Sequence, residues 1–189
     1  MKNRAMLAGT LAAGLLAFGT ASASATYSGD TSLDADGIWD NPLTVACAAC
    51  AFDVQEFTVD ADGLYTIDAF YPGDAANDEN LDGYLILYEG SFDPLDGSTG
   101  IIADDDDGPG GPTTSQIADV SLTAGTSYFL VTTAFSDAPT TFGQPAGVFE
   151  NTIAGDGNVT LVGAPIPAPA ALWLLGSALI GLGAARRKA

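Results

Sequence analysis

Short segments in which apolar and polar residues alternate run through the middle of the chain. In residues 64–71, Tyr65, Ile67 and Ala69 alternate with mostly polar neighbours, a period typical of a strand with one buried face. No helical period is sustained between residues 26 and 164. We therefore expect strands over residues 52–59, 64–71, 84–88, 100–103, 116–122, 126–135, 148–153 and 158–162. This spacing predicts an all-β fold, an antiparallel β-sandwich of jelly-roll type.

Three local patterns add detail to this expectation. Residues 84–88 (YLILY) are apolar throughout, which indicates a central strand with both faces buried. Residues 60–63 (DADG) match a hairpin turn, so residues 64–71 are expected to pair with residues 52–59 in a β-hairpin. Residues 124–125 (AG) indicate another tight turn.

The first 25 residues have the layout of a secretory signal peptide. Lys2 and Arg4 supply the positive start, and an apolar segment follows over residues 6–18. Residues 21–23 (ASA) and 23–25 (ASA) both offer the small-x-small cleavage pattern, so cleavage is expected after Ala23 or Ala25. The sequence therefore predicts export.

The last 25 residues combine a proline segment, an apolar run and a basic end. Pro165, Pro167 and Pro169 alternate with small or apolar residues, and proline cannot join a helix interior. The run over residues 170–185 carries no charge and, as a helix, would span roughly 24 Å, close to the hydrocarbon core of a bilayer. A buried core helix is the alternative. The terminal position and the basic end favour a transmembrane helix.

This tail resembles the PEP-CTERM sorting tail of exported bacterial proteins. The residues that carry the resemblance are the proline motif, Trp173 within the LWLLG segment, and the closing Arg186, Arg187 and Lys188. The family's Pro-Glu-Pro reads PAP over residues 167–169 here, and the PAALWL segment over residues 169–174 is more similar to the VPLPA-type variant. The resemblance implies processing by an exosortase-type enzyme at the cell envelope membrane. The protein would be membrane-anchored at first, and then delivered to the cell surface or extracellular matrix.

A second resemblance covers roughly residues 52–162. The order of residues 57–59 (FTV), 63–67 (GLYTI), 82–88 (DGYLILY), an acidic turn, and 122–131 (LTAGTSYFLV) resembles the bacterial pre-peptidase C-terminal (PPC-like) β-sandwich module. That resemblance implies an accessory or binding domain and no catalysis. The domain organisation we expect is a signal peptide (1–25), a lead-in with a CxxC motif (26–51), a β-sandwich domain (52–163) and a sorting tail (164–189).

Charge is distributed very unevenly along the chain. The 24 Asp and Glu residues all lie within residues 26–164, whereas the five Lys and Arg residues all lie in the terminal segments. No ion pair between side chains can form within that central stretch. Nucleic acid is excluded as a partner, because binding to phosphates requires Lys and Arg. Divalent cations or a salty medium would compensate the acidic charge, although acidity for solubility alone is the simpler explanation.

The only two cysteines, Cys47 and Cys50, form a CxxC motif. In an exported protein we expect a disulfide between them, closing a short loop. A thioredoxin-like redox site would need a following helix, for which the sequence gives no pattern. A zinc site would need further ligands, but the chain contains no His and no third Cys. A pair of free thiols is the remaining alternative.

Carboxylates gather in residues 104–107 (DDDD), and a second acidic segment covers residues 74–82. Asp104 and Asp106 would point to the same side of an extended chain and, with Asp82, make a candidate Ca²⁺ site. Residues 74–82 lack the EF-hand pattern. The competing interpretation is a solvated acidic turn without a specific ion.

The composition argues against catalysis. With no His in the chain and no Lys within residues 26–164, the Ser-His, Cys-His and Schiff-base arrangements are absent. We therefore expect a non-catalytic surface or matrix protein. The alternative is a Ca²⁺-dependent carbohydrate-binding or adhesion module that takes extracellular polysaccharide. Eight aromatic residues are candidates for sugar stacking, although strand spacing favours core positions for most: Trp39, Tyr71, Tyr84, Tyr88, Phe92, Phe135, Phe142 and Phe149.

Overall fold

The computed structural model describes residues 23–32, 35–72, 80–140 and 143–163. The body of the signal peptide and the sorting tail lie outside the described residues. The described part is all-β and consists of these strands: β1 (Ala25–Asp30), β2 (Gly37–Trp39), β3 (Cys50–Val59), β4 (Gly63–Phe70), β5 (Gly83–Glu89), β6 (Ile101–Asp105), β7 (Thr114–Leu122), β8 (Ser127–Ala134), β9 (Val148–Gly155) and β10 (Val159–Leu161). Every expected strand is present, with shifted ends. In the described residues we find no helix suited to crossing a membrane.

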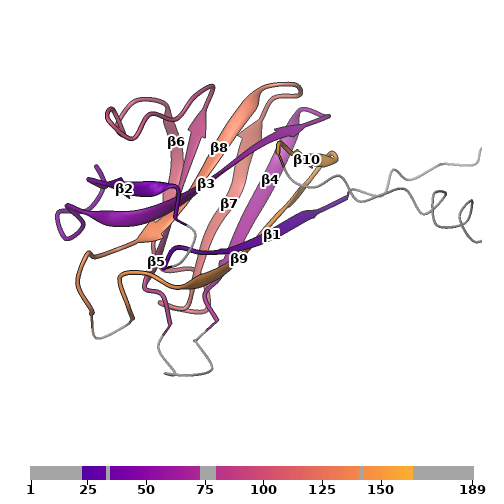
Figure 1. The fold of residues 1–189 in the computed structure, drawn as a ribbon. Coiled ribbons are helices and arrows are strands. Elements are labelled where there is room, and N and C mark those ends of the chain that lie inside the picture. The colour runs from indigo at the N-terminus through magenta and orange to yellow at the C-terminus, as the bar shows by residue number, and fades with distance from the viewer. Residues whose placement is uncertain (1–22, 33–34, 73–79, 141–142, 164–189) are drawn as a thin grey trace, which may run out of the picture.

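The strands form two antiparallel sheets (Figure 1). The four-stranded sheet has the order β1-β9-β4-β7, and the six-stranded sheet has the order β10-β3-β8-β5-β6, with β2 beside β3. Pairings between these strands are antiparallel, as predicted. Fully buried side chains from both sheets, such as Tyr65, Phe149, Leu87 and Tyr128, belong to one hydrophobic core.

The expected hairpin at residues 60–63 is wrong. Strand β3 pairs with β2, β8 and β10, whereas β4 pairs with β7 and β9 in the other sheet. The turn therefore connects the two sheets. Asp60 accepts hydrogen bonds from the backbone N and the Nδ2 of Asn158, both at 2.6 Å, and this fastens the turn to the β9–β10 connection. The Asp-Gly signal located a chain reversal correctly but did not determine which strands pair.

The segment expected as a lead-in, residues 26–51, forms part of both sheets. Strand β1 is the edge of the four-stranded sheet and pairs with β9 along its whole length. The Tyr27 ring packs edge-on against Phe149 at 6.0 Å, and its hydroxyl accepts a hydrogen bond of 3.0 Å from Asn151 Nδ2. Strand β2 pairs with the start of β3. This short segment lacks a long alternating pattern, which explains why the sequence did not reveal its strands.

Strand β5 is central and buried on both faces, as the sequence predicted. Leu85 lies opposite Thr132 on β8, and Thr132 accepts a hydrogen bond of 2.7 Å from Asn151 on the other sheet. This bond shows that Leu85 and Leu87 face the core between the sheets.

The other side of β5 carries Tyr84, Ile86 and Tyr88, which are also buried. An aromatic cluster covers this outer side, because the Phe92 ring lies 5.0 Å from Tyr88 and 5.3 Å from Trp39. The six-stranded sheet is therefore covered on both faces over this region.

Asp53 occupies an unusual position on β3. It lies opposite Thr132 in the strand register, so its side chain is on the side of the sheet that faces the core, close to Gly29 of β1. Partial burial, followed by the charge of Asp36, raises the pKa of Asp53 to about 6. Asp36 itself is fixed, because its carboxylate accepts a 2.8 Å hydrogen bond from Val54 N.

We predict that Leu87→Ala destabilises the fold by about 2–5 kcal/mol, because it leaves a cavity between the sheets. Equilibrium urea denaturation followed by circular dichroism measures this loss. Leu64→Ala on β4 is the matched control, because Leu64 is 52% exposed and its truncation should cost less than about 0.5 kcal/mol. Equal losses in the two variants would contradict the placement of Leu87 in the core.

A second prediction concerns pH. The folded pKa of Asp53 lies above the ordinary value, so its contribution favours folding below pH 4 and is lost as pH rises through about 6. Asp53→Asn should therefore stabilise the protein at pH 7.5 more than at pH 4.5. The difference should be on the order of 1 kcal/mol after allowance for solvent screening. Glu89→Gln, an exposed change of the same charge, is the control. A stability change that is independent of pH would contradict the burial of the Asp53 charge.

Candidate functional site

The four carboxylates of residues 104–107 have different surroundings. Asp104 accepts a 2.7 Å hydrogen bond from the hydroxyl of Tyr84. Asp105 accepts one of 2.7 Å from the backbone N of Gln116, which joins the end of β6 to β7. Asp106 has a buried Oδ1 that contacts no hydrogen-bond donor. Asp107 is exposed. The run is therefore partly a structural junction and is not one solvated turn.

Asp82 lies directly before β5 and is only 4% exposed. Its Oδ2 accepts a 2.6 Å hydrogen bond from Thr140 Oγ1. Burial, followed by the charges of Asp107, Asp82 and Asp105, raises the pKa of Asp106 to about 7. The charge of Asp82 thus acts on Asp106, whereas Asp104 is engaged with Tyr84.

Two of the three candidate Ca²⁺ ligands interact electrostatically, because the charge of Asp82 contributes to the raised pKa of Asp106. Within residues 23–32, 35–72, 80–140 and 143–163, no group of three or more His, Cys, Asp or Glu side chains is arranged to hold a metal ion. The calcium site therefore stays a prediction. Most of the second acidic segment, residues 74–82, lies outside the described residues.

A buried hydrogen-bond chain supports the acidic junction. Ser115 on β7 donates to the backbone carbonyl of Asp106 at 2.5 Å, and its Oγ lies 2.8 Å from the hydroxyl of Tyr71. The ring of Tyr71 packs over Gly83, where an added Cβ would clash with it. These contacts fix the turn after β6 against both sheets.

The outward face of the four-stranded sheet presents two rows of side chains. In the first row, Ser28, Glu150, Phe70 and Thr114 lie side by side on β1, β9, β4 and β7. Phe70, the last residue of β4, is 52% exposed, although phenylalanine is among the residue types most often buried.

The second row lies two residues along and contains Thr26, Thr152, Asp68 and Gln116. Thr26 Oγ1 is 3.0 Å from Thr152 Oγ1, and Gln116 Nε2 donates to Asp68 Oδ1 at 2.6 Å. We call the two rows the outer platform. A hollow of about 280 Å³ lies over its β4 and β7 side, where Pro109 and Gly110 form part of the lining.

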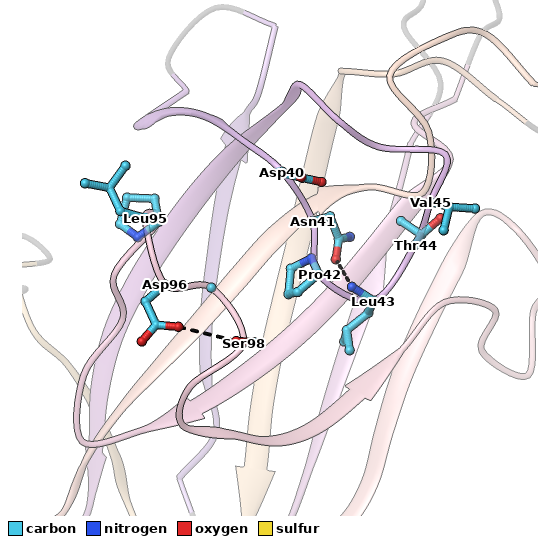
Figure 2. A pocket seen from close by; sticks show the side chains of 11 residues that line it. Asp40, Asn41, Pro42, Leu43, Thr44, Val45, Leu95, Asp96 and Ser98 are labelled. Carbon is cyan, nitrogen blue, oxygen red and sulfur yellow. Dashed lines mark hydrogen bonds between the residues drawn. The ribbon is translucent and has the colours of Figure 1, made fainter.

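A larger hollow, of about 440 Å³, lies between residues 40–45 and 94–98 (Figure 2). Val45 and Leu95 are almost fully exposed beside it. Asn41 Oδ1 accepts a 3.0 Å hydrogen bond from Leu43 N, which shapes one wall. Asp96 accepts a 3.3 Å bond from Ser98 in the other wall. Both walls are loops, and the hollow is open to solvent.

The structure joins Cys47 and Cys50 by a disulfide, with Cα atoms 5.5 Å apart. Both cysteines are buried, and Cys47 O accepts a 2.9 Å hydrogen bond from Asn41 N. The bond thus lies at the base of the loop that forms one wall of the larger hollow. The disulfide therefore ties this loop to the start of β3, because Cys50 is the first residue of that strand.

Most of the aromatic side chains considered for sugar stacking belong to the core. Trp39, Tyr71, Tyr84, Tyr88 and Phe149 are buried. Phe92 and Phe135 are partly buried against the same core, and Phe142 lies outside the described residues.

Sequence reasoning missed Phe70, the aromatic residue that is exposed on the outer platform. Its register was nevertheless visible, because Phe70 is in phase with Thr66 and Asp68 and out of phase with the buried Ile67 and Ala69. Glu150 and Gln116 were also missed, since only the sheet order brings them beside β4.

Comparison with known proteins gives no assignment for this chain. No protein-family model matches it, and no curated protein matches it either. The arguments for its function therefore come from its own residues and geometry.

Proposed function

We propose that this chain is an exported, non-catalytic protein of the cell surface or extracellular matrix. The observation that carries the proposal is the tail, in which Pro165, Pro167 and Pro169 precede an apolar run that ends at Arg186, Arg187 and Lys188. This arrangement resembles the PEP-CTERM sorting tail and implies transfer to an exosortase-type enzyme in the envelope membrane. The tail would anchor the precursor before processing.

Export is supported by the N-terminal residues, by the cysteines and by the charge of the domain. The charged and apolar parts of residues 1–25 suit a signal peptide. A Cys47–Cys50 disulfide is compatible with an oxidising compartment outside the cytoplasm. An acidic domain without a single cation also remains soluble and resists self-association outside the cell.

A binding role is supported by the architecture. Two antiparallel sheets with a shared core agree with a β-sandwich of jelly-roll type and with the PPC-like module. Such a module is an accessory domain. The chain contains no His, and residues 26–164 contain no Lys, so nucleophilic mechanisms that depend on these residues have no basis here.

The sorting role predicts a processed mature protein. If the tail is a sorting signal, cleavage should fall near residues 167–170, where proline holds the backbone extended. Intact-mass measurement of protein extracted from the cell surface should show a chain without Trp173. A control with Arg186, Arg187 and Lys188 replaced by Gln should accumulate uncleaved. A wild-type mass that retains residues 171–189 would support a permanent membrane anchor in place of sorting.

The second candidate function is Ca²⁺-dependent adhesion or carbohydrate binding. One observation favours it: the buried Oδ1 of Asp106 has no hydrogen-bond partner, and burial, followed by the charges of Asp107 and Asp82, raises the pKa of Asp106. A divalent cation would compensate the carboxylates of Asp82 and Asp106, and oxygen ligands suit Ca²⁺. Asp104 would contribute only by releasing Tyr84.

This candidate predicts that millimolar Ca²⁺ raises the melting temperature more than NaCl of equal ionic strength. An ion at a hundred times its dissociation constant adds about 2.7 kcal/mol, whereas monovalent salt only screens. The double variant Asp82→Asn, Asp106→Asn should lose the excess. The control Asp93→Asn, Asp96→Asn removes the same charge from a different acidic loop and should keep it. If the melting temperature of the wild type responds equally to both salts, the acidic residues 104–107 have only a structural role and bind no specific ion.

A further inference from the structure

The outer platform combines an exposed aromatic ring, a carboxylate and a hollow at one place on the four-stranded sheet. Phe70 ends the interior strand β4, with Glu150 directly beside it on β9 and Thr114 directly beside it on β7. Directly opposed residues in a sheet have Cβ atoms about 4.5–5.5 Å apart, so a ligand resting on the Phe70 ring also reaches the Glu150 carboxylate. The 280 Å³ hollow, lined by both residues, lies at this point.

The charge of the platform selects the chemistry of the partner. Asp68 and Glu150 are both exposed there, and residues 26–164 contain no cation to balance them. An anionic polymer is repelled from this face, whereas ammonium groups are attracted to it. An ammonium group near the face of an exposed aromatic ring gains cation–π attraction as well as the carboxylate interaction.

The backbone geometry favours a sugar chain over a peptide. Strands β4 and β9 are interior, and their backbone groups are paired within the sheet. Extended peptides are commonly recognised by adding a strand to an open edge, which the interior of a sheet face does not offer. Recognition at Phe70 and Glu150, which lie on the two interior strands, must therefore use side chains. The hydroxyl of Thr152 and the amide of Gln116 match the hydroxyl groups of a polysaccharide, whereas the Thr114 hydroxyl already bonds to Gly110 N and Gly111 O.

We propose that the outer platform binds a polysaccharide whose sugars carry free amino groups. A sugar ring rests on Phe70, its ammonium group pairs with Glu150 or Asp68, and its hydroxyls bond to the Thr and Gln side chains. This inference rests on the proposed surface location only for access to the polymer, because the binding itself belongs to the folded domain.

The test is sedimentation of the purified full chain, in mild detergent, with chitosan particles, which carry free amines. Fully acetylated chitin and anionic alginate are the comparison polymers. We expect binding to chitosan at least tenfold tighter than to either. Phe70→Ala should weaken chitosan binding about tenfold. Leu64→Ala, a truncation on the same strand and face at the same 52% exposure, should leave it unchanged.

A polyanionic protein also attracts a polycation without a site, so charge must be tested separately. Glu150→Gln should weaken chitosan binding several-fold, whereas Glu89→Gln on the other sheet changes the charge equally and should not. If Phe70→Ala and Glu150→Gln bind like wild type, the attraction is general and the proposal is overturned. Equal dependence of polylysine binding on Phe70 would identify a basic peptide as the occupant and would also overturn it. Intact-mass data on tail processing report the proposed sorting independently of these outcomes.

Discussion

The absence of cations between residues 26 and 164 is the constraint on which the rest of this structure depends. Carboxylates there have no basic side chain to pair with, so they must find hydrogen-bond donors elsewhere. Many accept from backbone N–H groups across turns and between sheets. Asp62 accepts from Ala124 N at 2.8 Å, and Asp156 accepts from Leu64 N at 2.8 Å. The acidic residues thus hold loops in place by hydrogen bonds to backbone N–H groups, with no contribution from ion pairs within this stretch.

Two partly buried carboxylates are held in surroundings that disfavour their charged form, which raises their pKa. Asp60, with two bonds from Asn158, has a lowered pKa, whereas partial burial raises the pKa of Asp53 and Asp106. The two raised groups lie at places where strands of different sheets approach, Asp53 near β1 and Asp106 against Ser115 of β7. These are the points at which protonation or a bound cation would stabilise the domain most.

The sequence predicted the strands well and their pairing poorly, for a physical reason. Alternation reports which face of a strand is buried, and it correctly marked the strand expected over residues 64–71, which the structure has as Gly63–Phe70; the continuous apolar run of β5 correctly indicated two buried faces. A turn signal such as residues 60–63 reports only that the chain reverses, and in a two-sheet fold the reversal can lead to the other sheet. The neighbours of a strand depend on contacts distant in sequence. Glu150 and Phe70 are 80 positions apart, so no local pattern placed them together.

The two sheets differ in what covers their outer faces. The six-stranded sheet carries apolar residues on both faces, and Trp39, Phe52 and Phe92 cover its outer side, so its central strands are committed to the core. The four-stranded sheet buries apolar residues on its inner face, whereas Leu64, Phe70 and Val148 are exposed on its outer face. Phe70, which lies beside Glu150 on that outer face, is not part of the hydrophobic core. A contact made outside the chain is the simplest physical reason for that arrangement.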